Sequence, residues 1–380
     1  MQERKKRRIV IASVLKPIND TRMYGKIGQS LAETGKFDVH IFGYPAPRPI
    51  PLETIQVHAS NSFRRLSIDR LLQPRRLIGS IVKLTPDLLI ITTHELLLVA
   101  MLVKLFTRCD ILYDLQENYY RNIRYTNAYP KLLRPLLAAY VRLKEIMLAP
   151  VVDYFILAER GYSEELGFLK KKYIVLENKL RKPTANFPKK SGADQNIHLL
   201  FSGTLADSTG VFEAIDLARS LYAQEPRIRL TIIGYSSQAS TLTRIKRITE
   251  QHDYISLIGG SALIPHSDII KEILQSDFGI ISYPPNKSTE NCIPTKLYEY
   301  IGCKLPILLI NHTPWVERSE IYSACIPIDF KNPNIPAILR QMQTKPFYPA
   351  DPRGVYWEDE ADKLISLIDY ILTIEKKTEY

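Results

Sequence analysis

Short apolar segments alternate with helix-like segments along the chain, and this alternation limits the fold more than any other feature. In the first half the apolar segments are RIVIASVL (8–15), FDVHIFGY (37–44), DLLIITT (87–93), CDILYDL (109–115) and DYFILA (153–158). Continuous apolar runs of this length are typical of strands buried on both faces of a sheet. Because helix-like stretches such as 22–35 separate them, the pattern predicts a parallel, doubly wound α/β sheet.

The same pattern begins again after a polar, proline-marked segment at 177–196, which predicts a linker. The further predicted strands are 197–203, 228–235, 255–260 and 277–283, and the further predicted helices are 209–224, 238–251 and 267–275. We therefore expect two Rossmann-like domains, at 1–182 and 183–352. The remaining segment, 353–380, predicts a charged amphipathic helix that begins near Trp357.

Composition excludes several classes of protein. The chain has 380 residues, 45% hydrophobic and 24% charged, as expected of a globular protein with two domains. Its longest mainly apolar run, 96–106, is about half the roughly 20 residues of a membrane-spanning helix. The basic N-terminus lacks a signal-peptide cleavage site, so we expect neither a spanning helix nor a secretion signal. The four cysteines have no metal-binding spacing, which predicts a reducing cytoplasm and neither a disulfide frame nor a zinc site.

Positive charge is concentrated in the first half. Residues 1–182 contain 31 Lys and Arg against 17 Asp and Glu, whereas residues 183–380 contain 20 against 23. The basic residues at 4–8, 63–77 and 121–148 are mixed with Leu, Ile and Tyr, which suits a surface that contacts anionic lipid headgroups. A solvated basic face is the alternative. Nucleic acid is not expected as a partner, because no zinc-finger, RNP or helix-turn-helix pattern is present.

The stretch NCIPTKLYEYIGCKLPILLI (291–310) combines a short helix with a buried strand. Pro294 suits the first turn of the helix, and Gly302 is expected as its C-cap. Lys296 and Glu299 are three residues apart and therefore share one helical face near the N-terminal end. That end carries partial positive charge and unpaired N–H groups, so it suits an anion. A solvated ion pair between the two side chains is the alternative.

Two glycine-containing corners follow predicted strands of the second domain. Ser202, Gly203 and Thr204 form one, and Gly234 and Tyr235 form the other. Ligands of open parallel sheets bind beyond the carboxyl ends of strands, so both corners are candidate anion sites. A glycine after a strand is more often just a tight turn, so a tight turn is the alternative for each corner alone.

Together with DFGIISYPP (277–285) and IPTKLYEYIG (293–302), these corners resemble the glycosyltransferases of the GT-B fold, and the retaining family 4 in particular. The resemblance covers essentially the whole chain and is strongest at 197–310. It implies two Rossmann-like domains that face a cleft, with the C-terminal helix crossing back to the first. It also implies transfer of a sugar from a nucleotide sugar, UDP- or GDP-linked, without a further cofactor.

The resemblance assigns a donor site to the second domain. Glu299 matches the second glutamate of the family's E-x7-E motif, which accepts hydrogen bonds from the ribose. Lys296 is expected to stabilise the departing diphosphate. The expected donor-binding residues are Ser202, Gly203, Thr204, Gly234, Tyr235, His266, Pro294, Thr295, Lys296 and Glu299, although His266 could instead cap a helix. The family's first glutamate falls on Asn291, beside Glu290, and its usual cations are replaced by Thr204 and uncharged residues near Thr209.

The first domain contains YDLQENYYRNI (113–123), which resembles the family's D-x-H-E segment. Asp114 and Glu117 match, but Gln116 stands at the histidine position. His94 could replace that histidine or be structural. We expect Asp20, His94, Glu117 and Lys296 as catalytic residues, and Lys16, Asp20, Arg22 and Gln116 as acceptor-binding residues. A helix N-cap at Asp20 or Thr21 is the alternative there.

The resemblance implies a retaining hexosyltransferase. Because the first domain is basic and rich in leucine, we expect a lipid-linked or surface-polysaccharide acceptor at the inner face of the cell membrane. No D-x-D pair that would hold a metal-bound diphosphate is present, so metal-independent transfer is expected. The alternatives are a non-hydrolysing sugar-nucleotide epimerase and a catalytically weak GT-B partner subunit.

Overall fold

The computed structural model describes residues 6–46, 54–60, 68–126, 129–170, 172–183 and 195–378, apart from the side chains of 68–71 and 374–378. The predicted basic segments 4–8 and 63–77 and the predicted linker 177–196 fall partly outside these residues. The chain divides into two compact units. The first unit comprises 1–181, 286–292 and 357–380, and the second unit comprises 182–285 and 293–356.

The first unit is built on a seven-stranded sheet with the order β3-β2-β1-β4-β5-β6-β7, in which every pairing is parallel. Its strands are β1 (Arg7–Pro17), β2 (Phe37–Tyr44), β3 (Ile55–Ala59), β4 (Leu88–Ile91), β5 (Asp110–Leu115), β6 (Tyr154–Leu157) and β7 (Tyr173–Val175). The strand order reverses between β1 and β4. In a doubly wound sheet the segments that follow such a pair of strands diverge and leave room for a ligand.

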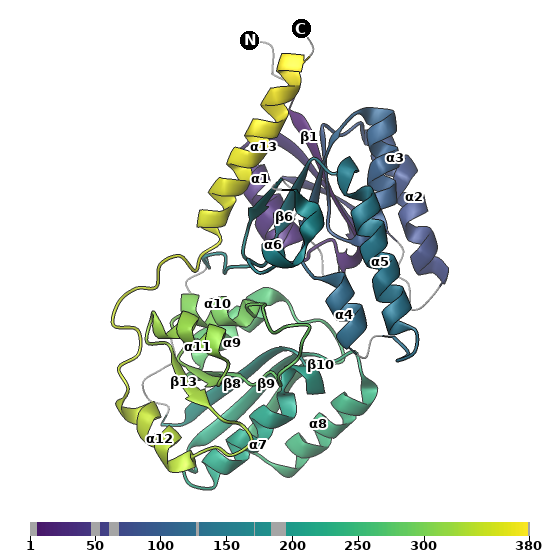
Figure 1. Cartoon of the computed structure of the whole chain (residues 1–380). Helices are drawn as coiled ribbons and strands as arrows, with labels where there is room; N and C mark the ends of the chain where they lie inside the picture. The colour runs from purple at the N-terminus through teal and green to yellow at the C-terminus, as the bar shows by residue number, and fades with distance from the viewer. Residues whose placement is uncertain are drawn as a thin grey trace. The chain divides into compact units, whose positions relative to one another are not determined.

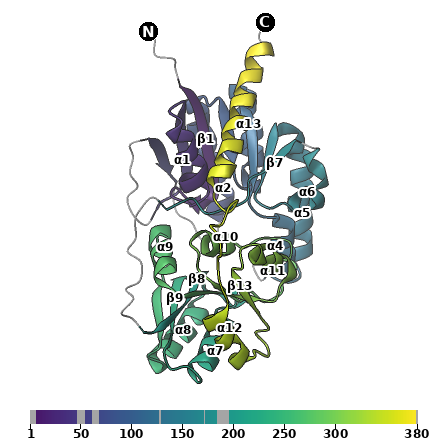
Figure 2. The same cartoon turned by 90° about the vertical axis from the view of Figure 1, so that its left-hand side faces the viewer.

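Helices cover both faces of this sheet (Figures 1 and 2). They are a π-helix (Met23–Gly28), α1 (Gln29–Glu33), α2 (Ile68–Leu84), α3 (Leu97–Thr107), α4 (Tyr119–Tyr125), α5 (Arg134–Leu148), α6 (Tyr162–Glu165) and α13 (Glu358–Thr378). Side chains of β1 alternate between the two faces. Val10 and Ala12 join the core beneath α2 and α3, whereas Ile9 and Ile11 join the core that contains Trp357 and the buried face of α13.

The second unit is built on a six-stranded sheet with the order β10-β9-β8-β11-β12-β13, again parallel throughout. Its strands are β8 (Ile197–Thr204), β9 (Ile228–Tyr235), β10 (Ile255–Gly260), β11 (Phe278–Ile281), β12 (Ile307–Ile310) and β13 (Cys325–Ile328). Its helices are α7 (Val211–Tyr222), α8 (Ala239–Gln251), α9 (His266–Gln275), α10 (Thr295–Gly302), α11 (Thr313–Glu320) and α12 (Ile335–Thr344). The order reverses between β8 and β11, so the loops after these strands adjoin the ligand position of this sheet.

The predicted fold class, two parallel-sheet α/β domains, is confirmed. The sequence patterns do not predict β3, β7 and β13, which lie at sheet edges, because edge strands are short and partly exposed and so lack a continuous apolar run. Two details differ from the sequence expectations. Segment 286–292 belongs to the first unit. Gly302 is not the C-cap: Cys303 occupies that position, and Lys304 takes the left-handed conformation with φ of 56°.

In the part of the chain that the structure describes, no helix is long and apolar enough to cross a membrane.

Candidate functional site

The two glycine corners of the second unit touch each other. Gly203 and Gly234 pair across β8 and β9, and their φ angles are 101° and 156°. A methyl group on Gly234 would lie 1.7 Å from the carbonyl oxygen of Gly203, so only glycine fits there. The two corners are therefore tight turns at which the backbones approach closely. Because Gly203 has no side chain, a side chain of α10 can lie against it.

Lys296 of α10 fills that space. A methyl group on Gly203 would lie 2.7 Å from Cε and 3.3 Å from Nζ of Lys296. The Lys296 ammonium lies 4.4 Å from the centroid of the Phe201 ring and 5.2 Å from that of Tyr283. Lys296 is only 7% exposed, and its Nζ has no hydrogen-bond partner among the described residues. Burial lowers the pKa of Lys296 to about 8, although the nearby Glu299 carboxylate opposes this shift.

Glu299 lies one turn further along the same helix and contacts α9. Its Oε1 is 2.7 Å from Nε2 of His266, the first residue of α9. Glu299 is buried, whereas the His266 side chain is one-third exposed. Because Lys296 and Glu299 are both buried, the alternative of a solvated ion pair is wrong. The structure instead brings Lys296, Glu299 and His266 together beside the glycine corners.

The other predicted donor-binding residues surround this cluster. Ser202 is buried and its Oγ lies 3.0 Å from the Tyr300 hydroxyl. Pro294 is the N-cap of α10 and Thr295 its first residue. Thr204 and Tyr235 end β8 and β9, and the Thr204 side chain is exposed. Sequence reasoning missed Phe201 and Tyr283, the two rings that lie against the ammonium, because an aromatic residue in a predicted buried strand is ordinary core. In the structure Phe201 lies in β8, whereas Tyr283 follows β11 and is half-buried.

In the first unit, Arg22 and Asp114 form a buried ion pair. The Arg22 guanidinium donates to both oxygens of Asp114 over 2.8–3.2 Å and to the carbonyl oxygen of Leu176 over 3.0 Å. Arg22 is 3% exposed and Asp114 is fully buried. The role of Arg22 as an acceptor contact stays a prediction, and the buried pair with Asp114 gives Arg22 a structural role within the fold. Gln116 completes the arrangement by donating to Asp114 over 2.8 Å.

Lys16, Asp20 and Glu117 gather at the same edge of the first sheet. Burial alone lowers the pKa of Lys16, but the carboxylates of Asp20, Glu117 and Asp114 raise it above its ordinary value. Asp20 Oδ1 accepts hydrogen bonds from the backbone N–H groups of Arg22 and Met23. This geometry favours the capping alternative for Asp20 over a base.

His94 is also engaged within the fold. It is buried, and Lys144 donates to its Nδ1 over 2.8 Å. Its ring meets the edge of Tyr119 at 4.7 Å, and its Nε2 lies 3.6 Å from Glu95. The structural alternative for His94 therefore fits better than the catalytic one. Glu117, another predicted catalytic residue, also bonds within the first unit, since it accepts a hydrogen bond from Asn122 over 2.7 Å.

A cavity of about 580 Å³ within the first unit was not anticipated from the sequence. It is lined by Asn118, Tyr120, Arg121, Tyr125, Arg142, Glu165, Lys287 and Glu290. Asn291, at the position of the family's first glutamate, donates to Glu165 over 3.0 Å. The only hint in the sequence is the density of Tyr and Arg at 119–125, because the segment that supplies Lys287 is more than 160 residues away.

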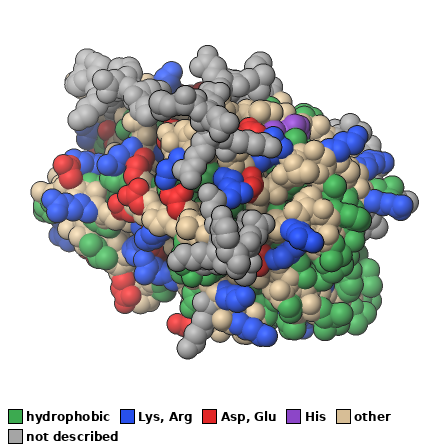
Figure 3. Space-filling model, turned by 90° about the horizontal axis from the view of Figure 1, so that it is seen from above, with side chains coloured by type: hydrophobic (Ala, Val, Ile, Leu, Met, Phe, Trp, Pro, Cys, Tyr) green, Lys and Arg blue, Asp and Glu red, His purple; other side chains and the backbone are tan. Residues whose placement is uncertain are grey.

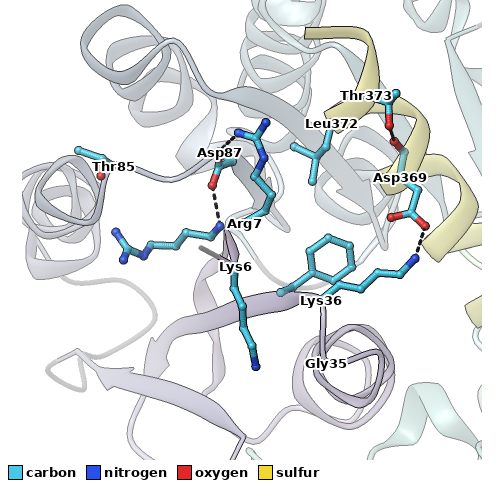
Figure 4. Close-up of a pocket in the computed structure, with 11 residues that line it drawn as sticks. Lys6, Arg7, Gly35, Lys36, Thr85, Asp87, Asp369, Leu372 and Thr373 are labelled. Carbon is cyan, nitrogen blue, oxygen red and sulfur yellow. Dashed lines mark hydrogen bonds and ion pairs between the residues drawn. The ribbon is translucent and has the colours of Figure 1, made fainter. Parts of the chain in front are cut away.

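A second cavity, of about 1140 Å³, lies at the amino end of β1 (Figure 4). Four of its charged side chains form two ion pairs, Arg7 with Asp87 and Lys36 with Asp369. This cavity lies at the opposite end of β1 from the ligand position of a parallel sheet. Within the described residues, no group of three His, Cys, Asp or Glu side chains is placed to hold a metal ion; metal-independent transfer stays a prediction.

No model of a known protein family matches the chain, and no curated protein matches its sequence. Its structure is similar to sucrose-phosphate synthase from Thermosynechococcus elongatus, with a TM-score of 0.73 and 12% identity over 97% of this chain and 100% of that one. It is similar to the Anabaena protein HepE in complex with UDP and glucose (TM-score 0.65, 13% identity, 95% and 99% covered). A glycosyltransferase from Rickettsia africae gives a TM-score of 0.61 at 14% identity (99% and 98% covered). These likenesses establish the GT-B fold; membership of family 4 stays a prediction.

Proposed function

We propose that the chain is a glycosyltransferase that moves a sugar from a nucleoside diphosphate sugar to a hydroxyl acceptor. One observation carries the proposal: the buried Lys296 ammonium lies against the Gly203 corner without a hydrogen-bond partner among the described residues. A buried charge is costly until an opposite charge compensates it. The diphosphate of the donor would supply that charge, and the N-terminus of α10 would add to the attraction.

The donor is best proposed as UDP-linked. HepE is described with UDP-glucose, and a trehalose-6-phosphate protein of similar structure with UDP-2-fluoro glucose. Glu299 is buried beside His266 at the glycine corners, and a carboxylate accepts hydrogen bonds from adjacent hydroxyls. We propose that Glu299 binds the ribose.

The proposed chemistry needs positioning and charge stabilisation. The bond between the anomeric carbon and the β-phosphate oxygen breaks, and its electron pair stays on the diphosphate. The acceptor oxygen forms the new bond to the same carbon on the same face, and its proton passes to a phosphate oxygen. Lys296 and the α10 N-terminus stabilise the growing negative charge, which is why we propose metal-independent transfer. We propose retention from the resemblance to family 4.

The acceptor would bind to the first unit. The cavity that contains Tyr120 and Tyr125 combines aromatic faces with the donors of Asn118, Arg121 and Arg142. Aromatic rings and forked donors together suit sugar rings and anionic groups. We propose a lipid-linked or polysaccharide acceptor, and we propose that the enzyme works in the cytoplasm against the inner face of the membrane, in agreement with the excess of basic residues at 1–182.

Ligand-dependent unfolding tests the donor site. The wild type, Lys296→Met, Glu299→Gln and the control Lys271→Met, an exposed lysine of α9, would be unfolded thermally with UDP, GDP, UDP-sugars and GDP-sugars. A ligand at about 100 times its Kd adds roughly 2.7 kcal/mol to the stability of the protein that binds it. We expect a UDP ligand to stabilise the wild type and the control but not Lys296→Met, and Glu299→Gln to respond weakly. An equal response of Lys296→Met would refute the assignment.

Turnover distinguishes the proposed function from its rivals. Release of UDP that depends on an acceptor supports a transferase. Conversion of a UDP-sugar without any acceptor would instead show an epimerase, and binding without turnover a partner subunit.

A further inference from the structure

Helix α5 presents an apolar face to the outside of the first unit. The exposed large residues at 131–148 are Leu132, Leu133, Leu136, Tyr140, Leu143, Ile146 and Met147, and Leu105 and Phe106 at the end of the adjoining α3 are also exposed. We call these nine residues the α5 face. Leu136, Tyr140 and Met147 are 71%, 60% and 68% exposed. In Figure 3 hydrophobic side chains gather on the right-hand side of the view, where α3 and α5 lie in Figure 1.

The polar residues of α5 point inward instead. Arg142 donates to Asn118 over 2.7 Å, Lys144 donates to His94 over 2.8 Å, and Glu145 is buried. A surface helix of a soluble protein has the opposite arrangement, with its polar residues outside. A contiguous apolar face of this kind marks an interaction surface rather than scattered exposed leucines.

The charges around the face indicate its partner. The exposed charged residues of α2, α3 with its C-cap, and the segment that leads into α5 are Arg75, Arg76, Lys83, Arg108 and Lys131, and within the described side chains of these elements no exposed residue is acidic. Cations on the elements next to an apolar face complement a surface that is anionic outside and apolar beneath. Two copies joined through this face would instead bring cations together.

We propose that the α5 face inserts into the boundary between headgroups and acyl chains of an anionic membrane, with the surrounding cations on the headgroups. This inference rests on the proposed function, because a lipid-linked acceptor would be met at that surface. The insertion adds hydrophobic contact to the electrostatic attraction that the charge of the first half predicts. Binding should therefore persist in part where salt screens the charges.

Flotation with vesicles tests the inference on the full chain. The probes are vesicles of phosphatidylcholine mixed with phosphatidylglycerol, and of phosphatidylcholine alone. The variants are Leu136→Ser with Met147→Ser on the α5 face, and Leu263→Ser with Ile321→Ser as a matched exposed apolar pair in the second unit. Loss of one inserted leucine-sized side chain weakens partitioning by roughly tenfold or more.

We expect the wild type and the control pair to float with the anionic vesicles, and the α5-face pair to bind them roughly a hundredfold more weakly. Part of the wild-type binding should remain in about 1 M NaCl, where the Debye length is about 3 Å. Equal binding of the α5-face pair would overturn the inference. The inference would also be overturned if light scattering showed that the wild type is a dimer and that Leu136→Ser dissociates it. A second copy of the chain would then cover the α5 face.

A further variant tests insertion directly, without relying on the loss of vesicle binding. Tyr140→Trp places a fluorophore on the α5 face, and brominated lipid should quench it on binding; absence of quenching by bound vesicles would overturn the inference. Stabilisation by UDP reports on the second unit separately. A variant that keeps this stabilisation but loses vesicle binding is folded, so failure of membrane binding and failure of the proposed function are distinguishable.

Discussion

Lys296→Met should make the protein more stable in the absence of ligand, although it removes the proposed diphosphate contact. Methionine keeps the length of the lysine stem and its packing between Phe201 and Tyr283, and it is a good helix former. The variant loses only the ammonium. In the free protein that ammonium is buried and has no hydrogen-bond partner among the described residues, so its removal relieves a cost.

The size of this effect follows from the pKa. Burial lowers the Lys296 pKa from 10.5 to about 8, which corresponds to about 3 kcal/mol at roughly 1.4 kcal/mol for each pH unit. The variant also forfeits the ring contacts of the ammonium, which contribute about 0.5–2 kcal/mol. The expected net gain at pH 7 is therefore about 1–3 kcal/mol, or several degrees in Tm for a domain of this size.

The gain should depend on pH in one direction. Between pH 8 and 10.5 the unfolded chain holds the lysine proton and the folded protein does not, so wild-type stability rises with pH in this window. Below pH 8 both states are protonated and the full cost applies. The charge-related difference should thus fall from about 3 kcal/mol at pH 7 to about 1.4 kcal/mol at pH 9.5.

Urea unfolding followed by tryptophan fluorescence measures this difference. Trp315 is buried in the second unit and Trp357 in the first, so a Trp357→Phe background reports on the second unit alone. Lys271→Met, at an exposed position, should change stability by less than about 0.5 kcal/mol at either pH. A Lys296→Met variant that is less stable than the wild type at both pH values would show that the ammonium is already compensated in the free protein, and the reasoning for an anion site would fail.

Three further predictions concern charge. The affinity for UDP should fall roughly tenfold between pH 7 and pH 9 in titration calorimetry, because Lys296 loses its proton near pH 8 in the free protein, and an affinity that does not change would contradict this. Asp114→Asn should lower the free energy of unfolding in urea by about 3–5 kcal/mol, because it leaves the buried Arg22 unpaired, whereas Asp369→Asn at an exposed pair should cost less than about 1 kcal/mol. Burial raises the pKa of Glu145 to about 7, so wild-type stability should fall relative to Glu145→Gln as pH rises from 4.5 to 7, by at most about 1.4 kcal/mol for each pH unit. Parallel pH profiles of the two proteins in urea unfolding would contradict this cause.

Most of the segments that build the two sheets were recognisable in the sequence, except the edge strands β3, β7 and β13. Runs such as FDVHIFGY (37–44) and IRLTIIGY (228–235) coincide with β2 and β9, because strands covered on both faces are apolar at most positions. The C-terminal end of α10 was harder to predict from the sequence. Gly302 suggested a glycine cap, but a cap depends on the conformation of each residue after the helix, and Lys304 takes the left-handed position instead.

The candidate site could be predicted only in part, because a sequence does not show which distant residues a side chain contacts. The spacing of Lys296 and Glu299 showed that they share a helical face, but not what each side chain meets. Arg22 illustrates the limit, because its partner Asp114 is 92 residues away and only the adjacency of the segments after β1 and β5 joins them. A buried pair and an exposed anion contact look the same in sequence.

By itself the sequence determined the two parallel sheets, the glycine corners and the excess of positive charge in the first half, since these depend on local periodicity, local backbone needs and composition. Only the tertiary structure decided that Lys296 is enclosed by Phe201 and Tyr283 and that α5 turns its leucines outward. An amphipathic helix specifies two faces but not which one meets the core. In α5 that choice came from Asn118 and His94, which lie in other segments and bind its polar residues on the inside.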